Sequence, residues 1–161
     1  MNAIIVEAVR TATDEVRDLI GELDRTLAQE YPPEQRHGLS LDAIFQPHVH
    51  FFIARLDGAA VGCGGVALFH TFAEVKRMYV REQVRGRGVG RALLSRIESA
   101  AKSSGLDVLR LETGTRQFAA IRLYERAGFS ICDAFGEYAS MEHETIATSV
   151  FLEKQLNIAA L

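Results

Sequence analysis

Hydrophobic and polar positions alternate along the chain in short runs, separated by segments whose apolar residues lie three or four apart. The runs predict strands at residues 3–8, 51–56, 60–69, 72–80, 108–113, 129–135 and 150–156. The wider spacing predicts helices at 11–30, at 118–127 and directly after the glycines that end at residue 90, with a short helix at 35–45. Strands interleaved with helices predict a mixed α/β fold in one domain over residues 1–161.

The composition narrows the partners that such a fold could bind. The 161 residues include 48% hydrophobic and 24% charged ones, as in a globular domain, and the formal net charge of −3 argues against general nucleic-acid affinity. Residues 76–96 nevertheless hold seven basic residues and one acid, Glu82. This local stripe suits one compact polyanionic ligand, with a solvated helix face as the alternative.

The start of the chain and its cysteines indicate neither a membrane nor a metal role. The first seven residues lack the basic start and long apolar run of a signal peptide, and no stretch approaches membrane-spanning length. Cys63 and Cys132 form neither a close pair nor a metal-ligand spacing, so we expect two reduced, mostly buried thiols. These features together predict a cytoplasmic protein.

The most informative segment joins a predicted strand to a predicted helix. It consists of Arg85, Gly86, Arg87, Gly88, Val89, Gly90 and Arg91. Its three glycines leave backbone N–H groups at a helix N-terminus open to an anion. Its arginines add guanidinium groups that can bind phosphate in a fork. The segment therefore predicts a pyrophosphate site.

Two other glycine-loop chemistries fail on spacing. A P-loop requires Gly-Lys followed by Ser or Thr, whereas Gly90 is followed by Arg91 and Ala92. The dinucleotide fingerprint requires glycine at its sixth place, which Arg91 occupies. A second glycine run at 62–65 fits a looser dinucleotide pattern, but more strand than helix follows it. Glycine kinks in a buried hairpin explain that run better.

The spacing of Arg85, Gly88 and Gly90 resembles the acetyl-CoA signature of the GNAT superfamily of N-acetyltransferases. A second block is similar to that family's next strand and helix: Leu111-Glu112-Thr113, then Gln117, Leu123-Tyr124 and Gly128-Phe129. Gln117 stands where the family commonly has Asn. The resemblance covers about residues 50–130, and two blocks in the family's order are more specific than one.

The resemblance implies a mixed, mostly antiparallel sheet with helices on both faces and a cleft between splayed strands that binds acetyl-CoA, without a metal. The backbone of Met78, Tyr79 and Val80 would hold the pantetheine arm, segment 85–91 the pyrophosphate, and Gln117 would contact the cofactor. The implied reaction is direct attack of a primary amine on the thioester. The acceptor stays open between a small amine, an amino acid and a peptide.

Two side chains are candidates for proton transfer. Tyr124, at the family's Leu-Tyr position, would protonate the leaving thiolate, or would only pack on pantetheine. Glu74 resembles the base of histone-type family members, or forms a structural ion pair with Lys76, Arg77 or Arg110.

Further candidates lie around these residues. Glu112 could bind the amine or pair with Arg110 or Arg116, and the polar connection at 136–148 could reach the acceptor pocket. The five histidines have no metal-ligand spacing, and we expect surface or satisfied core roles for them. They are His37, His48, His50, His70 and His143.

Two other functions remain as alternatives. A non-catalytic acyl-CoA-binding sensor would keep the glycine loop without a working acid and base, and a protein-interaction subunit would use the fold as a scaffold. A homodimer through the late strands is compatible with the resemblance, although Phe151 and Leu152 could equally belong to the core.

Overall fold

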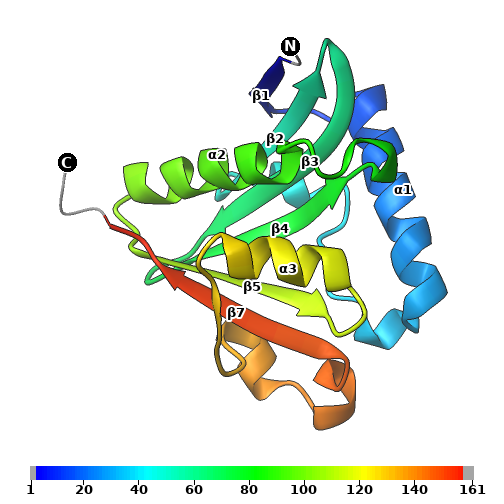
Figure 1. Cartoon of the computed structure of the whole chain (residues 1–161). Coiled ribbons are helices and arrows are strands. Elements are labelled where there is room, and N and C mark those ends of the chain that lie inside the picture. Colours follow the sequence, from blue (N-terminus) through cyan, green and yellow to red (C-terminus); the bar gives the residue numbers. More distant parts are fainter. Residues whose placement is uncertain (1–2, 158–161) are drawn as a thin grey trace.

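The computed structural model describes residues 3–157, and seven strands within them form one sheet (Figure 1). The strand order across the sheet is β1-β2-β3-β4-β5-β7-β6. The strands are β1 Ile4–Val9, β2 Val49–Leu56, β3 Ala59–Leu68, β4 Ala73–Val80, β5 Val108–Gly114, β6 Ser130–Ile131 and β7 Ser149–Gln155. Every neighbouring pair is antiparallel except β4 and β5, which are parallel.

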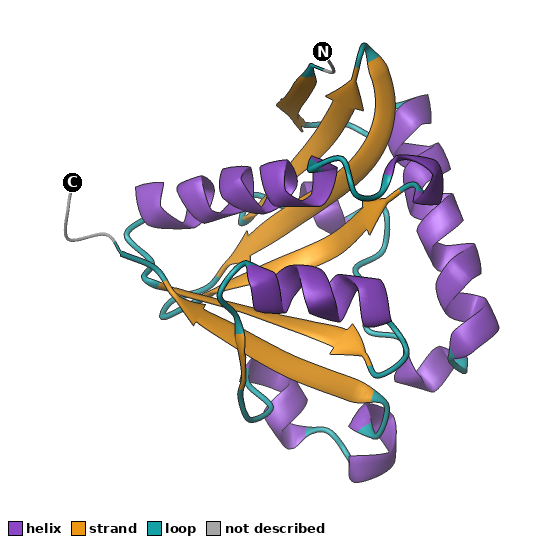
Figure 2. Cartoon of the chain, viewed as in Figure 1, coloured by secondary structure: helices purple, strands orange, loops and turns teal. Residues whose placement is uncertain are grey.

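Three α-helices cover the sheet, with α2 and α3 on one face and α1 on the other side (Figure 2). They are α1 Asp14–Glu30, α2 Val89–Ser103 and α3 Phe118–Arg126. The start of α1 is fixed by Thr13, whose side chain accepts a hydrogen bond from the Val16 N–H at 3.3 Å. This arrangement confirms the predicted mixed, mostly antiparallel α/β fold with helices on both faces.

Side chains that alternate along β2 point to opposite faces of the sheet and pack into two separate hydrophobic cores. Phe52 and Ala54 of β2 pack with the buried stripe of α2, whereas Phe51 and Ile53 pack with the buried face of α1. The α2 stripe comprises Val89, Leu93, Leu94, Ile97 and Ala101. Because both faces of β2 and β3 are buried, these strands are nearly continuous hydrophobic runs.

The sheet opens between its two parallel strands. The pairing of β4 with β5 covers only Ala73 with Leu109 and Glu74 with Arg110. Beyond Glu74 the two strands diverge, and β4 also bulges against β3, where the register shifts between Cys63 and Gly65. Arg77 lies in this bulge with a φ of 53°. The splayed cleft implied by the family resemblance is thus present.

The predicted helix at 35–45 is wrong. The chain forms two short 3-10 turns instead, η1 Pro33–Gln35 and η2 Ala43–Phe45, with an extended stretch between them. The physical reason is a close approach at Gly38, where any Cβ would collide with the Arg77 guanidinium. Gln35 and His37 also bond to the Glu144 and Thr145 carbonyls, which ties this stretch in extended form to the connection before β7.

The predicted strand at 129–135 is mostly wrong, since only β6 pairs with β7. After Ile131 the chain leaves the sheet so that Phe135 can pack edge-to-face against Phe72 and Phe151. The following connection is less polar than predicted. It contains the 3-10 turns η4 Gly136–Ser140 and η5 His143–Ile146, and it buries Tyr138 almost completely.

The second glycine run lies inside β3, as the structural interpretation predicted. A Cβ at Gly64 would meet the Met78 sulfur at 2.8 Å, and one at Gly65 would meet the Phe51 ring at 2.9 Å. These glycines admit neighbouring side chains and serve no helix. Phe151 and Leu152 are buried within the chain, so they offer no late-strand surface for a dimer. No helix within residues 3–157 is long and apolar enough to cross a membrane.

Candidate active site

A cavity of about 110 Å³ lies at the divergence of β4 and β5. It is lined by the end of α1, the loop at 35–38, both splayed strands, α3 as far as Tyr124, and Tyr138. Five of the predicted candidate residues meet there: Glu74, Met78, Glu112, Gln117 and Tyr124. The side chains of Tyr79 and Val80 do not line the cavity, and segment 85–91 lies outside it, at the start of α2.

The glycine loop has the geometry of an anion site. Gly86 and Gly88 have φ values of 85° and 89°, which disfavour residues with a side chain, and Gly88 caps α2 with no side-chain hydrogen bond. The first-turn N–H groups of α2 therefore stay available to a ligand, at the positive end of the helix. Arg85, Arg87 and Arg91 are exposed around them. The residues present fit the pyrophosphate of CoA.

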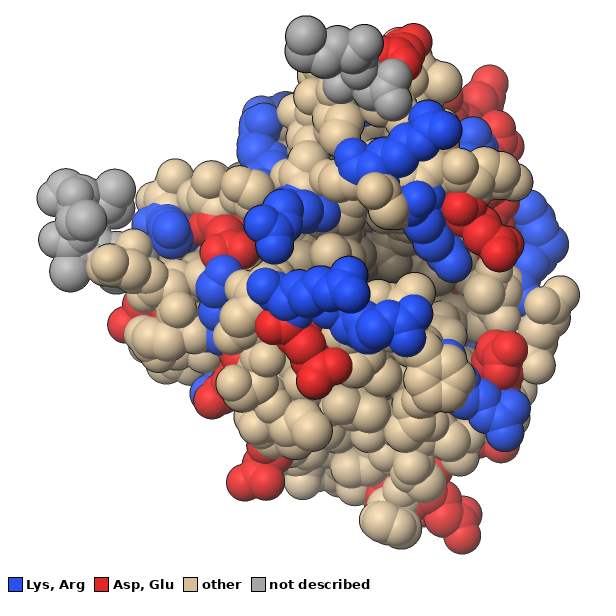
Figure 3. Space-filling view, in the orientation of Figure 1, with Lys and Arg blue, Asp and Glu red and all other residues tan. Residues whose placement is uncertain are grey.

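Lys and Arg side chains surround a hollow on the face that carries α2 and α3 (Figure 3). The basic stripe predicted at 76–96 is not one surface, however. Lys76 and Arg77 are buried, Arg81 pairs with Glu22 of α1 at 2.7 Å, and Arg96 lies over the Phe52 ring. Only the arginines of segment 85–91 in the middle of the stripe are exposed at the glycine loop.

The splayed edge of β4 leads from the glycine loop to the cavity. Met78 lines the cavity, while the Tyr79 hydroxyl donates to Glu22 Oε1 at 3.0 Å, on the α1 side. The Val80 carbonyl accepts from Arg85 Nε at 3.0 Å, which ties the strand end to the loop. Since β5 does not pair with β4 here, backbone groups of residues 78–80 remain to hold an extended ligand.

Tyr124 projects from α3 into the cavity. It is buried, its ring packs edge-to-face on Phe129, and its hydroxyl has no hydrogen-bond partner among residues 3–157. Burial raises the pKa of the phenol, and the nearby Glu112 carboxylate raises it further. The phenol therefore keeps its proton at neutral pH and can donate it to a neighbouring anion.

Glu74 is part of a buried polar triad. Its carboxylate pairs with Lys76 Nζ at 2.9 Å and accepts from the Tyr138 hydroxyl at 2.8 Å. Lys76 also donates to the Tyr138 oxygen at 3.1 Å. The structural alternative from the sequence, an ion pair with Lys76, is therefore present. Pairs with Arg77 and Arg110 are not, because Arg77 pairs with Asp24 and Arg110 with Glu153.

Glu112 has fewer hydrogen-bond and ion-pair partners than Glu74, the other carboxylate of the cavity. Neither ion pair predicted for it forms, since Arg110 and Arg116 pair with Glu153 and Glu30. It accepts one hydrogen bond, from Ser149 Oγ at 2.7 Å. Burial raises the pKa of Glu112, opposed by the Ser149 hydrogen bond and by the charges of His37 and Lys76. It is thus a carboxylate with free lone pairs and raised basicity.

The loop at 35–38 closes the cavity from the far side of the sheet. Gln35 Nε2 donates to the Glu144 carbonyl at 3.1 Å, and His37 Nε2 donates to the Thr145 carbonyl at 2.9 Å. Both bonds join the loop to the connection before β7. They place Arg36 and His37 in the cavity wall, a position that was not predicted from the sequence for either residue.

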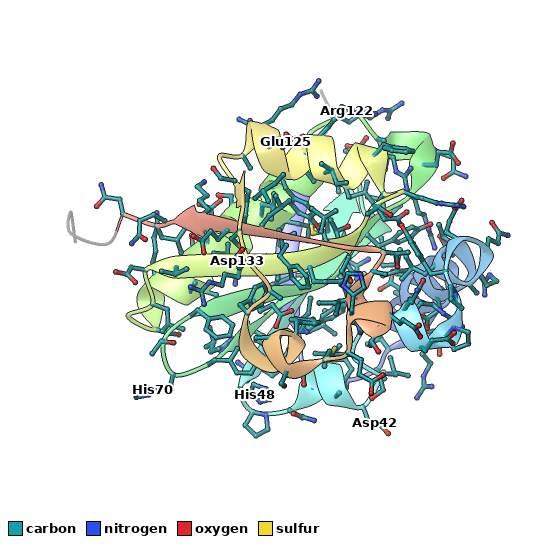
Figure 4. All side chains as sticks on the ribbon, turned by 90° about the horizontal axis from the view of Figure 1, so that it is seen from below. Asp42, His48, His70, Arg122, Glu125 and Asp133 are labelled. Atoms are coloured by element: carbon teal, nitrogen blue, oxygen red, sulfur yellow. The ribbon has the colours of Figure 1, made fainter. Side chains whose placement is uncertain are left out.

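The other histidines and the cysteines lie away from this chemistry. His48, His50 and His70 are exposed, and Figure 4 shows His48 and His70 projecting from the rim of the molecule. Burial raises the pKa of Cys63 to about 12 and that of Cys132 to about 11, so neither is a thiolate at neutral pH. Within residues 3–157, no group of three or more metal-binding side chains occurs.

A sheet split between two parallel strands, with an open helix N-terminus at one end of the split and a cavity lined by Tyr124 and two carboxylates at the other, is the arrangement expected of an acyltransferase that holds a phosphorylated thioester. Sequence comparison agrees. The model of the acetyltransferase (GNAT) family matches residues 14–129, which is most of the chain. The chain therefore belongs to the GNAT acetyltransferase family, whose acyl donor is acetyl-CoA, and the predicted enzyme class is confirmed.

Curated relatives cover most of the chain. An "IAA acetyltransferase" of Azospirillum brasilense is 43% identical over 145 residues, which are 89% of this chain and 92% of the relative. The N-acetyltransferase YsnE of Bacillus subtilis, which is uncharacterised, is 30% identical over 88% of this chain and 93% of its own.

Solved structures share the fold. A candidate acyl-CoA N-acyltransferase from Klebsiella pneumoniae superposes with a TM-score of 0.75 at 32% identity, covering 96% of this chain and 98% of its own. The PaiA N-acetyltransferase of Thermoplasma acidophilum, solved with coenzyme A, gives a TM-score of 0.71 at 18% identity, covering 95% and 99%. At that identity the second match supports the fold alone.

Proposed function

We propose that this protein is an N-acetyltransferase that transfers the acetyl group of acetyl-CoA to a primary amine by direct attack. The observation that carries the proposal is the cavity at the β4–β5 split, which is lined by the protonated Tyr124 of α3 and by the Glu112 carboxylate of β5. Acetyl-CoA supplies an activated thioester carbonyl when bound. The single-domain organisation, the cytoplasmic location and a homodimer stay predictions from the sequence.

Different segments of the chain would bind different parts of acetyl-CoA. Segment 85–91 would bind the pyrophosphate through the α2 N-terminus and its exposed arginines, and the free edge of β4 at Met78, Tyr79 and Val80 would hold the pantetheine arm. Gln117 lines the cavity at the start of α3 and would contact the cofactor from there. Its role in cofactor binding is part of this proposal.

The proton transfers balance within the cavity. The neutral amine nitrogen forms a bond to the carbonyl carbon, the C–S bond breaks, Tyr124 gives its proton to the leaving thiolate, and a carboxylate takes the proton that the amine loses. Glu74 remains the base predicted from the sequence. Its ion pair with Lys76 favours a positioning role, however, so we propose Glu112 as the base that faces the amine.

The test begins with a thermal-shift titration of wild-type protein with CoA, followed by thiol release from acetyl-CoA. The acceptor panel holds amino acids, polyamines, aminoglycosides, short peptides and the acceptor named for the A. brasilense relative. A CoA-dependent shift with turnover that falls in Tyr124→Phe supports the enzyme. A shift with no turnover on any acceptor favours the acyl-CoA sensor, and no shift removes the basis of both functions.

A further inference from the structure

Two arginine side chains line one wall of the cavity. Arg36 and Arg77 both face it, and in each the buried Nε lacks a hydrogen-bond partner among residues 3–157. A buried N–H without an acceptor is unfavourable, and native proteins rarely leave one unpaired. Two such groups in one cavity wall indicate that a ligand supplies the acceptor atoms.

The position of Arg77 is built into the fold. Its backbone is held at a φ of 53° in the β4 bulge, and its side chain is only 5% exposed. One end of the guanidinium pairs with Asp24 of α1, and Gly38 lacks the Cβ that would collide with the other end. Asp24 itself is mostly exposed, at 57%. Helix, bulge and loop thus fix one guanidinium while its Nε stays unused.

The two carboxylates that line the cavity differ in their partners. Lys76 neutralises Glu74 in the buried triad. Glu112, on the opposite strand, has no ion pair among residues 3–157 and accepts only from Ser149. The cavity wall therefore carries two arginines with an unused Nε, Arg36 on the loop and Arg77 on β4, and the wall formed by β5 carries Glu112, which has no ion pair among residues 3–157.

We infer that the acceptor is a free amino acid, whose carboxylate binds Arg36 and Arg77 while its amine faces Glu112. This inference rests on the N-acetyltransferase function proposed above. Arginine matches a carboxylate through two parallel hydrogen bonds, which a neutral amide cannot accept with the same charge. A polyamine or an aminoglycoside would place a further cation beside two arginines.

Matched substrate pairs test the inference on the wild-type protein. Thiol release from acetyl-CoA is measured with L-amino acids and with the same residues as carboxamides, which keep the amine and remove the negative charge. We expect kcat/KM for the preferred amino acid to exceed that for its carboxamide about 100-fold, as for loss of hydrogen bonds to a charged group. Equal turnover of both members of each pair would overturn the inference.

Two arginine variants test which residues distinguish the free amino acid from its carboxamide. Arg77→Gln should raise KM for the amino acid about 30-fold with little change in kcat, and should leave the carboxamide kinetics unchanged. Arg36→Gln, in a loop, provides the same test if Arg77→Gln does not fold. Arg55→Gln is the control, because Arg55 also pairs with a carboxylate of α1, Glu15, but does not line the cavity. An equal loss in all variants would contradict the assignment.

A binding measurement separates this inference from the proposed function. The midpoint of CoA-loaded protein is recorded with the free amino acid and with its carboxamide, and we expect a further stabilisation by the free acid alone. CoA binding with turnover only of polyamines, aminoglycosides or peptides would overturn the amino-acid acceptor and leave the acetyltransferase intact. Failure of CoA itself to bind would overturn the proposed function instead.

Discussion

The two ends of the split between β4 and β5 are built in different ways. The proposed donor end is one continuous segment, 85–91, whose arginines are exposed and which would bind through backbone N–H groups at the start of α2. The acceptor end combines the loop at 35–38, β4, β5 and η4, and its ionisable groups are buried or half-buried. A donor used by a whole family can be bound by local backbone geometry, whereas a particular acceptor requires side chains from several elements.

The largest expected effect is at the acceptor end. Glu112→Gln should lower kcat about 1000-fold, because the amine loses its proton acceptor, while the CoA affinity stays that of wild type. Steady-state kinetics and a CoA titration check the two halves of this prediction. The control is Ser149→Ala, which removes only the hydrogen bond to Glu112 and should lower kcat about tenfold or less. Unchanged kcat in Glu112→Gln would exclude Glu112 as the base.

Glu112→Gln should raise the stability of the protein although it lowers kcat. Burial raises the pKa of Glu112 in the folded protein, so the folded state holds this proton over a pH range in which the unfolded chain has released it. Stability is therefore lost as pH rises through that range. Glu112→Gln should have a higher Tm than wild type at neutral pH, and the difference should vanish below pH of about 4, the range of an unperturbed glutamate.

The next largest effect concerns the buried triad. Glu74→Gln leaves Lys76 buried without its ion partner and should reduce the free energy of unfolding by about 3 kcal/mol. Urea unfolding measures this loss. The matched control is Glu153→Gln, which breaks the more exposed pair with Arg110 and should change stability by less than about 1 kcal/mol. A fully stable Glu74→Gln protein with abolished turnover would instead restore Glu74 as the base.

Tyr124→Phe tests the point at which the two ends meet. The change removes one hydroxyl that has no hydrogen-bond partner within the described chain, so stability should stay within about 1 kcal/mol of wild type. The value of kcat should fall about 100-fold while CoA affinity is retained. Weaker CoA binding with unchanged kcat would show that the ring only packs on the cofactor.

A smaller effect is expected at the donor end. Gly88→Val should weaken CoA binding about 30-fold, because a branched side chain at a φ of 89° strains the cap and covers the N–H groups. Gly105→Val is the matched control, since Gly105 has a φ of 79°, open surroundings and a place at the far end of α2. The two variants should lose similar stability, and only the first should lose affinity for CoA in a calorimetric titration.

The sequence signal for the proposed donor end is local. Alternating glycine and arginine before a helical stripe fixes both the backbone and the charge within a few residues. The resemblance to a known family placed Tyr124 and Gln117 in the same way, and both line the cavity.

The acceptor end could not be predicted in this way. The positive φ of Arg77 follows from a register shift between β3 and β4, and Gly38 matters only because Arg77 passes beside it. The expected helix at 35–45 and strand at 129–135 failed for the same reason. In both segments, tertiary packing on Arg77 or Phe135 decides the conformation.

The most direct test of this division is a crossed measurement of CoA affinity and kcat in Gly88→Val and Glu112→Gln. The division predicts opposite results: weaker CoA binding in the first variant, and wild-type CoA affinity with about 1000-fold lower kcat in the second. If both variants lose CoA affinity together, or if Glu112→Gln turns over like the wild type, the separation of donor and acceptor ends is contradicted.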